Sequence, residues 1–249
     1  MRKIVLMYHD VYSDSETESG FQFPTSFPYK ISAEKFESHV KLAHTYCKQN
    51  NLSLASVEFT FDDGGVSFYT VIAPILEKYG FKGVFFISTS YIDTERFLTK
   101  EQIQSLYKRG HIIASHSHSH PRNMTMLSEQ DLLFEWETST RILEGIIKTP
   151  ILVASIPSGF NSPQVMNTVE QAGVKILYTS KPTDKISVIS GLTTIGRYVV
   201  HCNTTIDTIS KILYNRGYRQ SLLVKWHLVG IAKVMLGSSY NWIKKRIIR

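Results

Sequence analysis

Short runs of apolar and β-branched residues recur along the chain, separated by longer stretches in which apolar positions follow helical spacing. Such short, continuously apolar runs are typical of strands buried in a parallel sheet. We therefore expect strands at residues 3–8, 57–61, 83–87, 111–115, 151–155, 175–178 and 194–200.

The stretches between these runs predict helices. Three of the helical patterns stop at Gly80, Gly110 and Gly173, and glycine is a common residue just after a helix. A fourth begins at Ser128, a favourable N-cap, and then presents large apolar residues on one face. The predicted helices span residues 33–47, 68–79, 99–109, 128–147 and 163–172.

Strands that alternate with helices of this length predict βαβ units and a parallel sheet, and about seven repeats favour closure of that sheet. We expect a single α/β domain, a distorted (β/α)7–8 barrel over residues 1–215, followed by a basic amphipathic segment at residues 216–249. Catalytic groups of such a barrel lie on loops that follow the carboxyl ends of the strands. Residues 11–32 do not fit the repeat and indicate a long loop over the barrel mouth or a substrate-binding flap.

Composition narrows the class of protein. The chain has 249 residues, 43% of them hydrophobic, enough for one full-sized core. Its two cysteines, Cys47 and Cys202, form neither a disulfide framework nor a zinc knuckle and are interpreted as small hydrophobic residues. The net charge of +7 comes from residues 208–249, which hold nine Lys and Arg and no Asp or Glu. We therefore expect no nucleic-acid partner for the main domain.

The sequences at the two ends of the chain indicate where in the cell the protein is expected. The apolar run that follows the basic start is too short for a signal peptide, and no apolar stretch is long enough to span a bilayer, so we expect a cytoplasmic protein. Residues 220–249 combine Leu with Trp226, Trp242, Lys225 and the basic residues 244–246. This mixture predicts peripheral attachment to the inner face of an anionic membrane, and a last barrel helix with an exposed basic end is the alternative.

Two aspartates follow the predicted strand 57–61. Asp62 and Asp63 lie at a strand end, where successive side chains diverge, so one carboxylate can bind a cation while the other stays free beside it. Gly64 and Gly65 permit a tight turn there. Taken alone, an Asp-Asp-Gly sequence is more often simply a turn.

Three histidines follow the predicted strand 111–115. His116, His118 and His120 begin where a barrel strand ends, and a histidine-rich stretch alone is as often a surface feature. Two separate loops that bring carboxylate and imidazole to one barrel mouth make a metal site the favoured interpretation. Such ligands suit zinc and neighbouring first-row divalent ions.

The sequence Thr-Phe-Asp-Asp-Gly, followed some fifty residues later by His-Ser-x-x-His, resembles the first two motifs of the polysaccharide deacetylases. These form carbohydrate esterase family four, the nodulation-type chitooligosaccharide deacetylase homology domain, and their fold is a distorted (β/α) barrel. The resemblance covers residues 57–200. It implies that Asp62 is the general base and that Asp63, His116 and His120 bind one divalent metal, zinc first, with cobalt or nickel as alternatives. His118 is not a ligand by this analogy.

Later parts of the chain depart from the family pattern. Pro157 and Gly159 are kept, but Ser155 and Ser158 stand where the family often has an Arg that orients the base and an aromatic residue. Arg197 resembles a late Arg of members that act on poly-N-acetylglucosamine-like chains, and either supplies that positive group or forms a structural salt bridge.

The proton donor is not assigned by the sequence, because the family's Leu-x-His-Asp motif is absent. His201 and His227 are interpreted as structural. Tyr8, His9 and Asp10 at the end of the first strand are another candidate for the donor. Some family members share a Tyr-His after this strand, so the resemblance implies that His9 and Asp10 line the site and contact substrate together with Pro157 and Arg197.

The resemblance implies a metal-dependent hydrolase that removes N-acetyl groups from an N-acetylhexosamine-containing glycan or a lipid-linked saccharide in surface polysaccharide metabolism. Two alternatives stay open. One is a hydrolase of another amide or ester, since fold and ligands do not define the acyl group. The other is a metal-containing glycan-binding protein with weakened catalysis, which the missing Arg and proton donor motivate.

Overall fold

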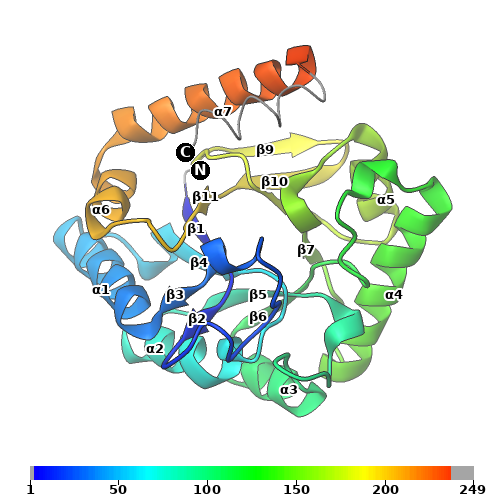
Figure 1. Cartoon of the computed structure of the whole chain (residues 1–249), viewed down its shortest axis with the longest axis horizontal. Helices are drawn as coiled ribbons and strands as arrows, with labels where there is room; N and C mark the ends of the chain where they lie inside the picture. The colour runs from blue at the N-terminus through cyan, green and yellow to red at the C-terminus, as the bar shows by residue number, and fades with distance from the viewer. Residues whose placement is uncertain (1–2, 237–249) are drawn as a thin grey trace.

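The structure, a computed structural model, describes residues 3–236. Its main sheet is curled and surrounded by helices on the outside (Figure 1). The strands of this sheet are β1 (Ile4–Tyr8), β4 (Val57–Phe61), β5 (Gly83–Ile87), β6 (Ile112–Ser115), β7 (Val153–Ser155), β8 (Ile176–Thr179), β9 (Ile186–Ile189), β10 (Leu192–Gly196) and β11 (Tyr198–Val199). The helices are α1 (Ala33–Gln49), α2 (Ala73–Lys78), α3 (Lys100–Lys108), α4 (Glu129–Ile147), α5 (Pro163–Gln171), α6 (Ile206–Tyr214) and α7 (Arg216–Leu236).

The strand order explains the barrel. It runs β11-β1-β4-β5-β6-β7-β8-β10-β9, and every pair is parallel except β9 with β10. β10 pairs with β8 and β11 pairs with β1, yet β10 and β11 are consecutive and separated by Arg197 alone. The chain itself therefore joins β11, one end of the sheet, to β10, the strand next to the other end, and the predicted distorted α/β barrel is confirmed.

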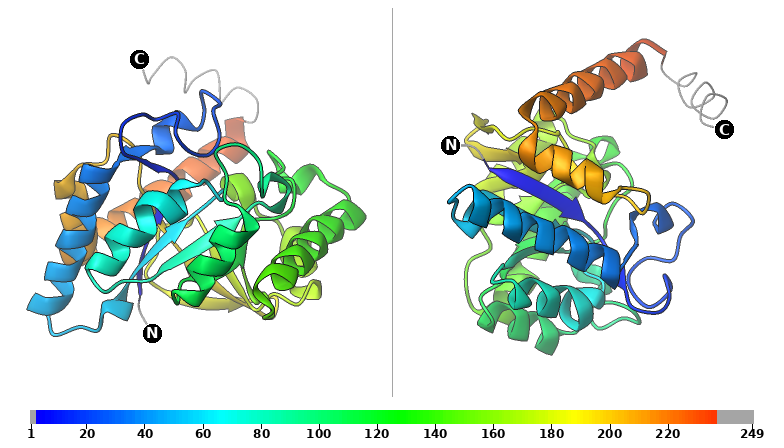
Figure 2. Two further views of the ribbon diagram at one scale, coloured as in Figure 1. Left: turned by 90° about the horizontal axis from the view of Figure 1, so that it is seen from below. Right: turned by 90° about the vertical axis from the view of Figure 1, so that its left-hand side faces the viewer.

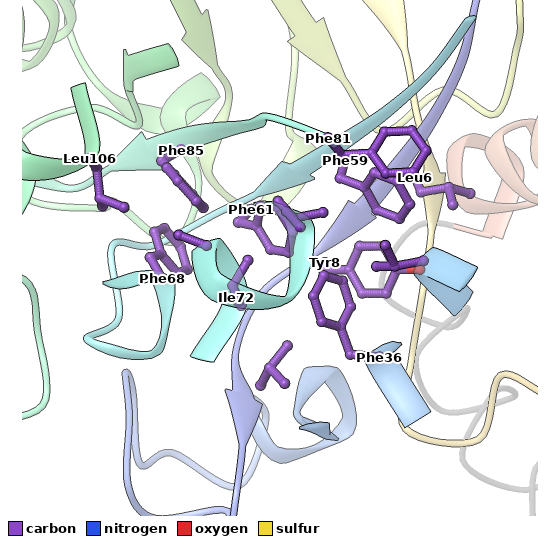
Figure 3. Close-up of a cluster of buried hydrophobic side chains, with 14 of the residues drawn as sticks. Leu6, Tyr8, Phe36, Phe59, Phe61, Phe68, Ile72, Phe81, Phe85 and Leu106 are labelled. Carbon is purple, nitrogen blue, oxygen red and sulfur yellow. The ribbon is translucent and has the colours of Figure 1, made fainter. Parts of the chain in front are cut away.

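An aromatic cluster holds β4 in place (Figure 3). The rings of Phe61 and Phe85 lie 5.3 Å apart, and Phe68 stacks on Phe85 at 5.0 Å. Tyr8 of β1 meets Phe36 of α1 edge to face at 5.2 Å. All five side chains are buried. Because side chains alternate along a strand, packing of Phe61 outward directs Asp62, the next residue, into the barrel.

Several predicted elements need correction. The expected strand 194–200 is not continuous, because it changes partners at Arg197. The expected helix 68–79 begins as a π turn, Phe68–Ile72, in which Ala73 bonds to the carbonyl of Phe68. Pro74 explains this, since proline has no N–H for the regular bond to residue 70. The hairpin strand β9 and helix α6 were not predicted.

The long loop before α1 crosses in front of the sheet (Figure 1) and contains the small pair β2 (Val11–Tyr12) and β3 (Ile31–Ser32) and the 3-10 turn η1 (Phe27–Tyr29). Other single turns are η2 (Leu54–Ser56), η4 (Thr89–Tyr91), η5 (Met124–Met126) and η6 (Pro157–Gly159).

Helix α7 begins at the predicted boundary of the basic segment and packs beside α6 at the edge of the molecule (Figure 2). Within residues 3–236, no helix is long and apolar enough to cross a membrane. The predictions made for Trp242 and for residues 244–246 lie outside the described residues.

Candidate active site

A cavity of about 920 Å³ lies at the carboxyl ends of the barrel strands. Loops after β1, β4, β5, β6, β7 and β8 form its walls, together with β11 and the residues on either side of it, the long loop before α1, and α7. The polar side chains of its wall include those predicted for the site: His9, Asp10, Asp62, Asp63, His116, His120 and Arg197.

Asp62 and Arg197 form a buried, bidentate ion pair. The Arg197 Nη1 and Nη2 atoms donate to Asp62 Oδ1 and Oδ2 at 2.6 and 2.9 Å. Arg197 is only 1% exposed, and its guanidinium also lies over the ring of Phe86. Burial alone would raise the pKa of Asp62, but the Arg197 and His116 charges outweigh it and hold that pKa below its ordinary value. The carboxylate is thus kept ionised and fixed in direction.

Asp63, His116 and His120 converge on one point. The His116 and His120 Nε2 atoms lie 3.5 and 3.2 Å from Asp63 Oδ1. One ligand atom from each residue lies within 4.8 Å of the others. Burial would raise the pKa of Asp63, but the two histidines outweigh it and lower the pKa well below its ordinary value. Three donors that point at one spot fit a metal ion better than a protein hydrogen bond.

Local backbone geometry directs these side chains. Asp63 has a φ of 87° and His120 a φ of 57°, values that residues other than glycine rarely adopt. Gly64 follows with a φ of 98°, and a Cβ there would lie 3.2 Å from the side chain of Ile87. Unfavourable backbone conformations of this kind concentrate at functional sites, where surrounding structure maintains them.

Two residues that the sequence did not identify support the histidine loop. The buried Glu135 of α4 accepts hydrogen bonds from the backbone N–H groups of His118 and Ser119 at 2.9 and 2.8 Å, and from the Ser119 hydroxyl. Ser155 of β7 lies between His116 and Asp62, with its Oγ 2.7 Å from His116 Nδ1 and 3.4 Å from Asp62 Oδ1. Ser155 thus occupies the position of the missing Arg without replacing its charge.

His9 and Asp10 both reach the cavity but differ in surroundings. His9 Nδ1 is buried and has no hydrogen-bond partner among residues 3–236, and burial lowers the pKa of the imidazole despite the nearby Asp63 and Asp62. Asp10 Oδ1 accepts hydrogen bonds from the Ser19 and Ser67 hydroxyls at 2.6 and 3.0 Å. Asp10 thereby connects the long loop to the loop after β4.

Two other residues singled out in the sequence lie outside the cavity wall or the ligand cluster. Pro157 is buried in the η6 turn, whose neighbours Ile156, Ser158 and Gly159 line the cavity in its place. His118 bonds to Thr89 Oγ1 at 2.9 Å, outside the cluster of three.

The long loop covers the mouth as expected. It contributes Phe21, Phe23 and Tyr29 to the cavity wall. The rings of His9 and Tyr29 lie 4.5 Å apart, and Tyr29 meets His201 at 4.8 Å. His201, interpreted as structural from the sequence, is thus part of the wall, as is Trp226 of α7.

One sequence signal could have revealed Glu135. The stripe of Leu132, Trp136 and Leu143 directs one face of α4 inward, and Glu135 lies on that face. A carboxylate on a buried face requires a partner. The family resemblance had marked Arg197 as a candidate, but its contact with Asp62 depends on closure of the barrel and could not be derived from the sequence.

Comparison with known proteins decides the family. The sequence profile of the family described as "Polysaccharide deacetylase" matches residues 49–177, slightly more than half of the chain. The chain belongs to the polysaccharide deacetylase family. The family resemblance inferred from the two motifs is therefore confirmed, and with it the enzyme class of N-deacetylating hydrolases.

Relatives of this family member include the poly-beta-1,6-N-acetyl-D-glucosamine N-deacetylases of Staphylococcus aureus strains MSSA476 and N315. They are 23% identical over 202 residues, which cover 69% of this chain and 70% of the relative.

Solved structures of deacetylases share the fold. The Streptococcus pyogenes deacetylase PplD in complex with acetate has a TM-score of 0.69 at 21% identity, covering 86% of this chain and 98% of that one. The polysaccharide deacetylase BC0361 from Bacillus cereus has a TM-score of 0.71 at 19% identity, covering 86% and 69%.

Proposed function

We propose that this polysaccharide deacetylase is a metal-dependent enzyme that hydrolyses the acetamide groups of a poly-N-acetylglucosamine-type glycan. The observation that carries the proposal is the position of Asp62, held by Arg197 beside the Asp63, His116 and His120 cluster. A protein that only bound a metal and a glycan would have no use for a second carboxylate fixed next to the cluster.

The cluster fits a divalent cation. Asp63 Oδ1 is buried without a hydrogen-bond partner among the described residues, and two imidazole nitrogens face it. One carboxylate and two imidazoles are ligands that suit zinc, with cobalt or nickel as alternatives, and three ligands leave positions open for substrate and water. A bound cation would polarise the acetyl carbonyl and lower the pKa of a water molecule.

The protein's own groups handle the protons. Asp62, kept ionised by Arg197, is the base that removes a proton from the attacking water. The leaving amine needs a proton, and we assign its delivery to His9, a buried imidazole in the cavity wall whose Nδ1 has no other partner among the described residues. Because burial lowers the pKa of His9, this imidazole would relay to the amine the proton that the attacking water releases to Asp62. Ser155 contacts both Asp62 and His116 and so fixes the position of the base relative to the metal ligands.

The glycan class is supported by the relatives and by the cavity. The Staphylococcus aureus relatives are named for poly-beta-1,6-N-acetyl-D-glucosamine. At about 920 Å³ the cavity is at the upper end of the range of small-molecule sites, and aromatic side chains, which suit the flat faces of sugar rings, line its mouth.

Acetate release tests the proposal. Metal-stripped protein is reloaded with zinc, cobalt or nickel and mixed with β-1,6- or β-1,4-linked N-acetylglucosamine oligomers. We expect acetate only from the reloaded protein, and a fall of about 10²–10⁴-fold in Asp62→Asn, the range typical of general acid–base groups. Metal binding by the wild type without Asp62-dependent acetate release from either oligomer would instead indicate a glycan-binding protein.

A further inference from the structure

Helix α7 has two apolar faces. One face packs on the barrel, where Tyr218 and Leu222 join the main core. The other carries Val224, Leu228 and Ile231, which are 58%, 61% and 53% exposed. Their spacing of four and three residues aligns them on one side of the helix. An aligned row of large apolar side chains in water is typical of a surface that meets something else.

The charges around this exposed face are positive. Arg216 and Lys225 of α7 are exposed, and the sequence from residue 208 onward contains no Asp or Glu. Arg219 of the same helix, in contrast, points to the barrel and pairs with Asp184. The face is therefore complementary to an anionic surface that can also receive apolar side chains. An anionic lipid headgroup layer above acyl chains has both properties.

We propose that α7 docks on an anionic membrane surface, lying in the plane of the headgroups with Val224, Leu228 and Ile231 directed toward the acyl chains. Figure 1 has α7 along one edge of the molecule, outside β9 and β10, and the right-hand view of Figure 2 has its last turns extending beyond the barrel. Because Tyr218 and Leu222 face the barrel, the exposed face on the opposite side of α7 is directed away from the described residues of the barrel.

Docking also orients the active site. Trp226, between Lys225 and His227 on the same helix, lines the catalytic cavity, and Lys181 Nζ lies 5.9 Å from its ring. One helix thus forms both the docking face and part of the cavity wall. The substrate is then a glycan carried at the membrane, such as a lipid-linked saccharide. This assignment of substrate rests on the proposed function, whereas the docking itself does not.

Vesicle sedimentation with the full chain tests the docking. Vesicles contain either phosphatidylcholine with phosphatidylglycerol or phosphatidylcholine alone. We expect binding to the anionic vesicles, much weaker binding to the neutral ones, and loss of binding as salt rises. A triple variant, Val224→Gln with Leu228→Gln and Ile231→Gln, keeps helix-favouring residues and should lower the affinity for anionic vesicles at least ~10-fold. A matched control, Phe134→Gln with Val188→Gln, replaces exposed apolar residues on α4 and β9 and should bind as the wild type does.

The readouts separate docking from catalysis. Acetate release from soluble oligomers should be the same in the triple variant and the wild type, because none of the three residues lines the cavity. Equal vesicle binding by the triple variant and the wild type, or equal binding to neutral and anionic vesicles, would overturn the docking. A wild-type dimer in lipid-free solution that the triple variant converts to a monomer would overturn it too, because a second copy would then cover the face.

Discussion

The two halves of the active site are built in different ways. Asp63, His116 and His120 come from two short motifs, each placed directly after one barrel strand. The other half joins Asp62 to Ser155 and Arg197, which lie 93 and 135 positions further along the chain. The first half depends on local turns after β4 and β6, and the second depends on how the barrel closes. The two halves should therefore fail separately, one through loss of metal and the other through a misdirected base.

The largest effect is expected in the metal half. His120→Ala removes one of three proposed ligands, so the affinity for zinc should fall by more than ~100-fold, the upper end of what outer partners of a metal site contribute. Titration calorimetry on metal-stripped protein measures this. The control is His118→Ala, in the same loop but bonded to Thr89 instead, which should bind metal normally. Equal losses in both variants would show that the ligand set is wrong.

The next effect separates the base half from the metal half. Arg197→Lys keeps a positive charge but loses the two-pronged contact with Asp62. We expect kcat to fall about 100-fold, the typical cost of a catalytic group displaced by roughly 1 Å, while zinc affinity stays unchanged. A parallel loss of zinc affinity would mean that the two halves are one unit.

The pH profile sharpens this contrast. Asp62 must be ionised to act as base, and Arg197 opposes the effect of burial on its pKa. In Arg197→Gln burial acts unopposed by that charge, so the pKa of Asp62 rises and the acidic limb of kcat/KM moves to higher pH. In Arg197→Lys the limb should move little. An unmoved limb in Arg197→Gln would remove Asp62 from the role of base.

A smaller effect is expected from the support of the histidine loop. Glu135→Gln replaces a carboxylate that accepts two backbone N–H bonds, and we expect zinc affinity to fall about 10-fold, at the low end of the range for outer partners. Glu137→Gln, exposed on the same helix, serves as the control in the same calorimetric titration. If both variants bind zinc as the wild type does, the loop is held without Glu135.

The smallest effect concerns Asp10, which ties the long loop before α1 to the loop after β4. Burial raises its pKa to about 6, against the hydrogen bond from Ser19. The folded state therefore holds this proton more tightly than the unfolded state, and the stability it contributes is lost as pH rises from about 4 through 6. Relative to the wild type, the Tm of Asp10→Asn should gain a few degrees over that window, measured by calorimetry. Asp14→Asn, exposed in the same loop, should show no such gain.

The features that could be predicted from the sequence follow the same division: local structure was predicted well, and contacts between distant residues were not. The bounds of β4 and β5 were predicted correctly, because the alternating run of β4 ends at Asp62 and the apolar run of β5 ends at Ser88. The conformations of Asp63 and His120, in contrast, come from backbone values that no periodicity reveals. The contact of Arg197 with Asp62 was one of two alternatives in the sequence, and only the change of strand partner at that residue decides it. The sequence places the charged Glu135 on the inward face of its helix, but it does not reveal that this carboxylate binds the backbone of His118 and Ser119.

Arg197 lies where the barrel closes and also holds the base, because at this residue the chain passes from β10, which pairs with β8, to β11, which pairs with β1. We call this junction the seam of the barrel. A local opening of the seam would detach the guanidinium from Asp62 while most of the aromatic core stayed packed. The protein is therefore expected to lose activity on heating before its core unfolds, and the gap between the two temperatures measures how tightly the seam is held.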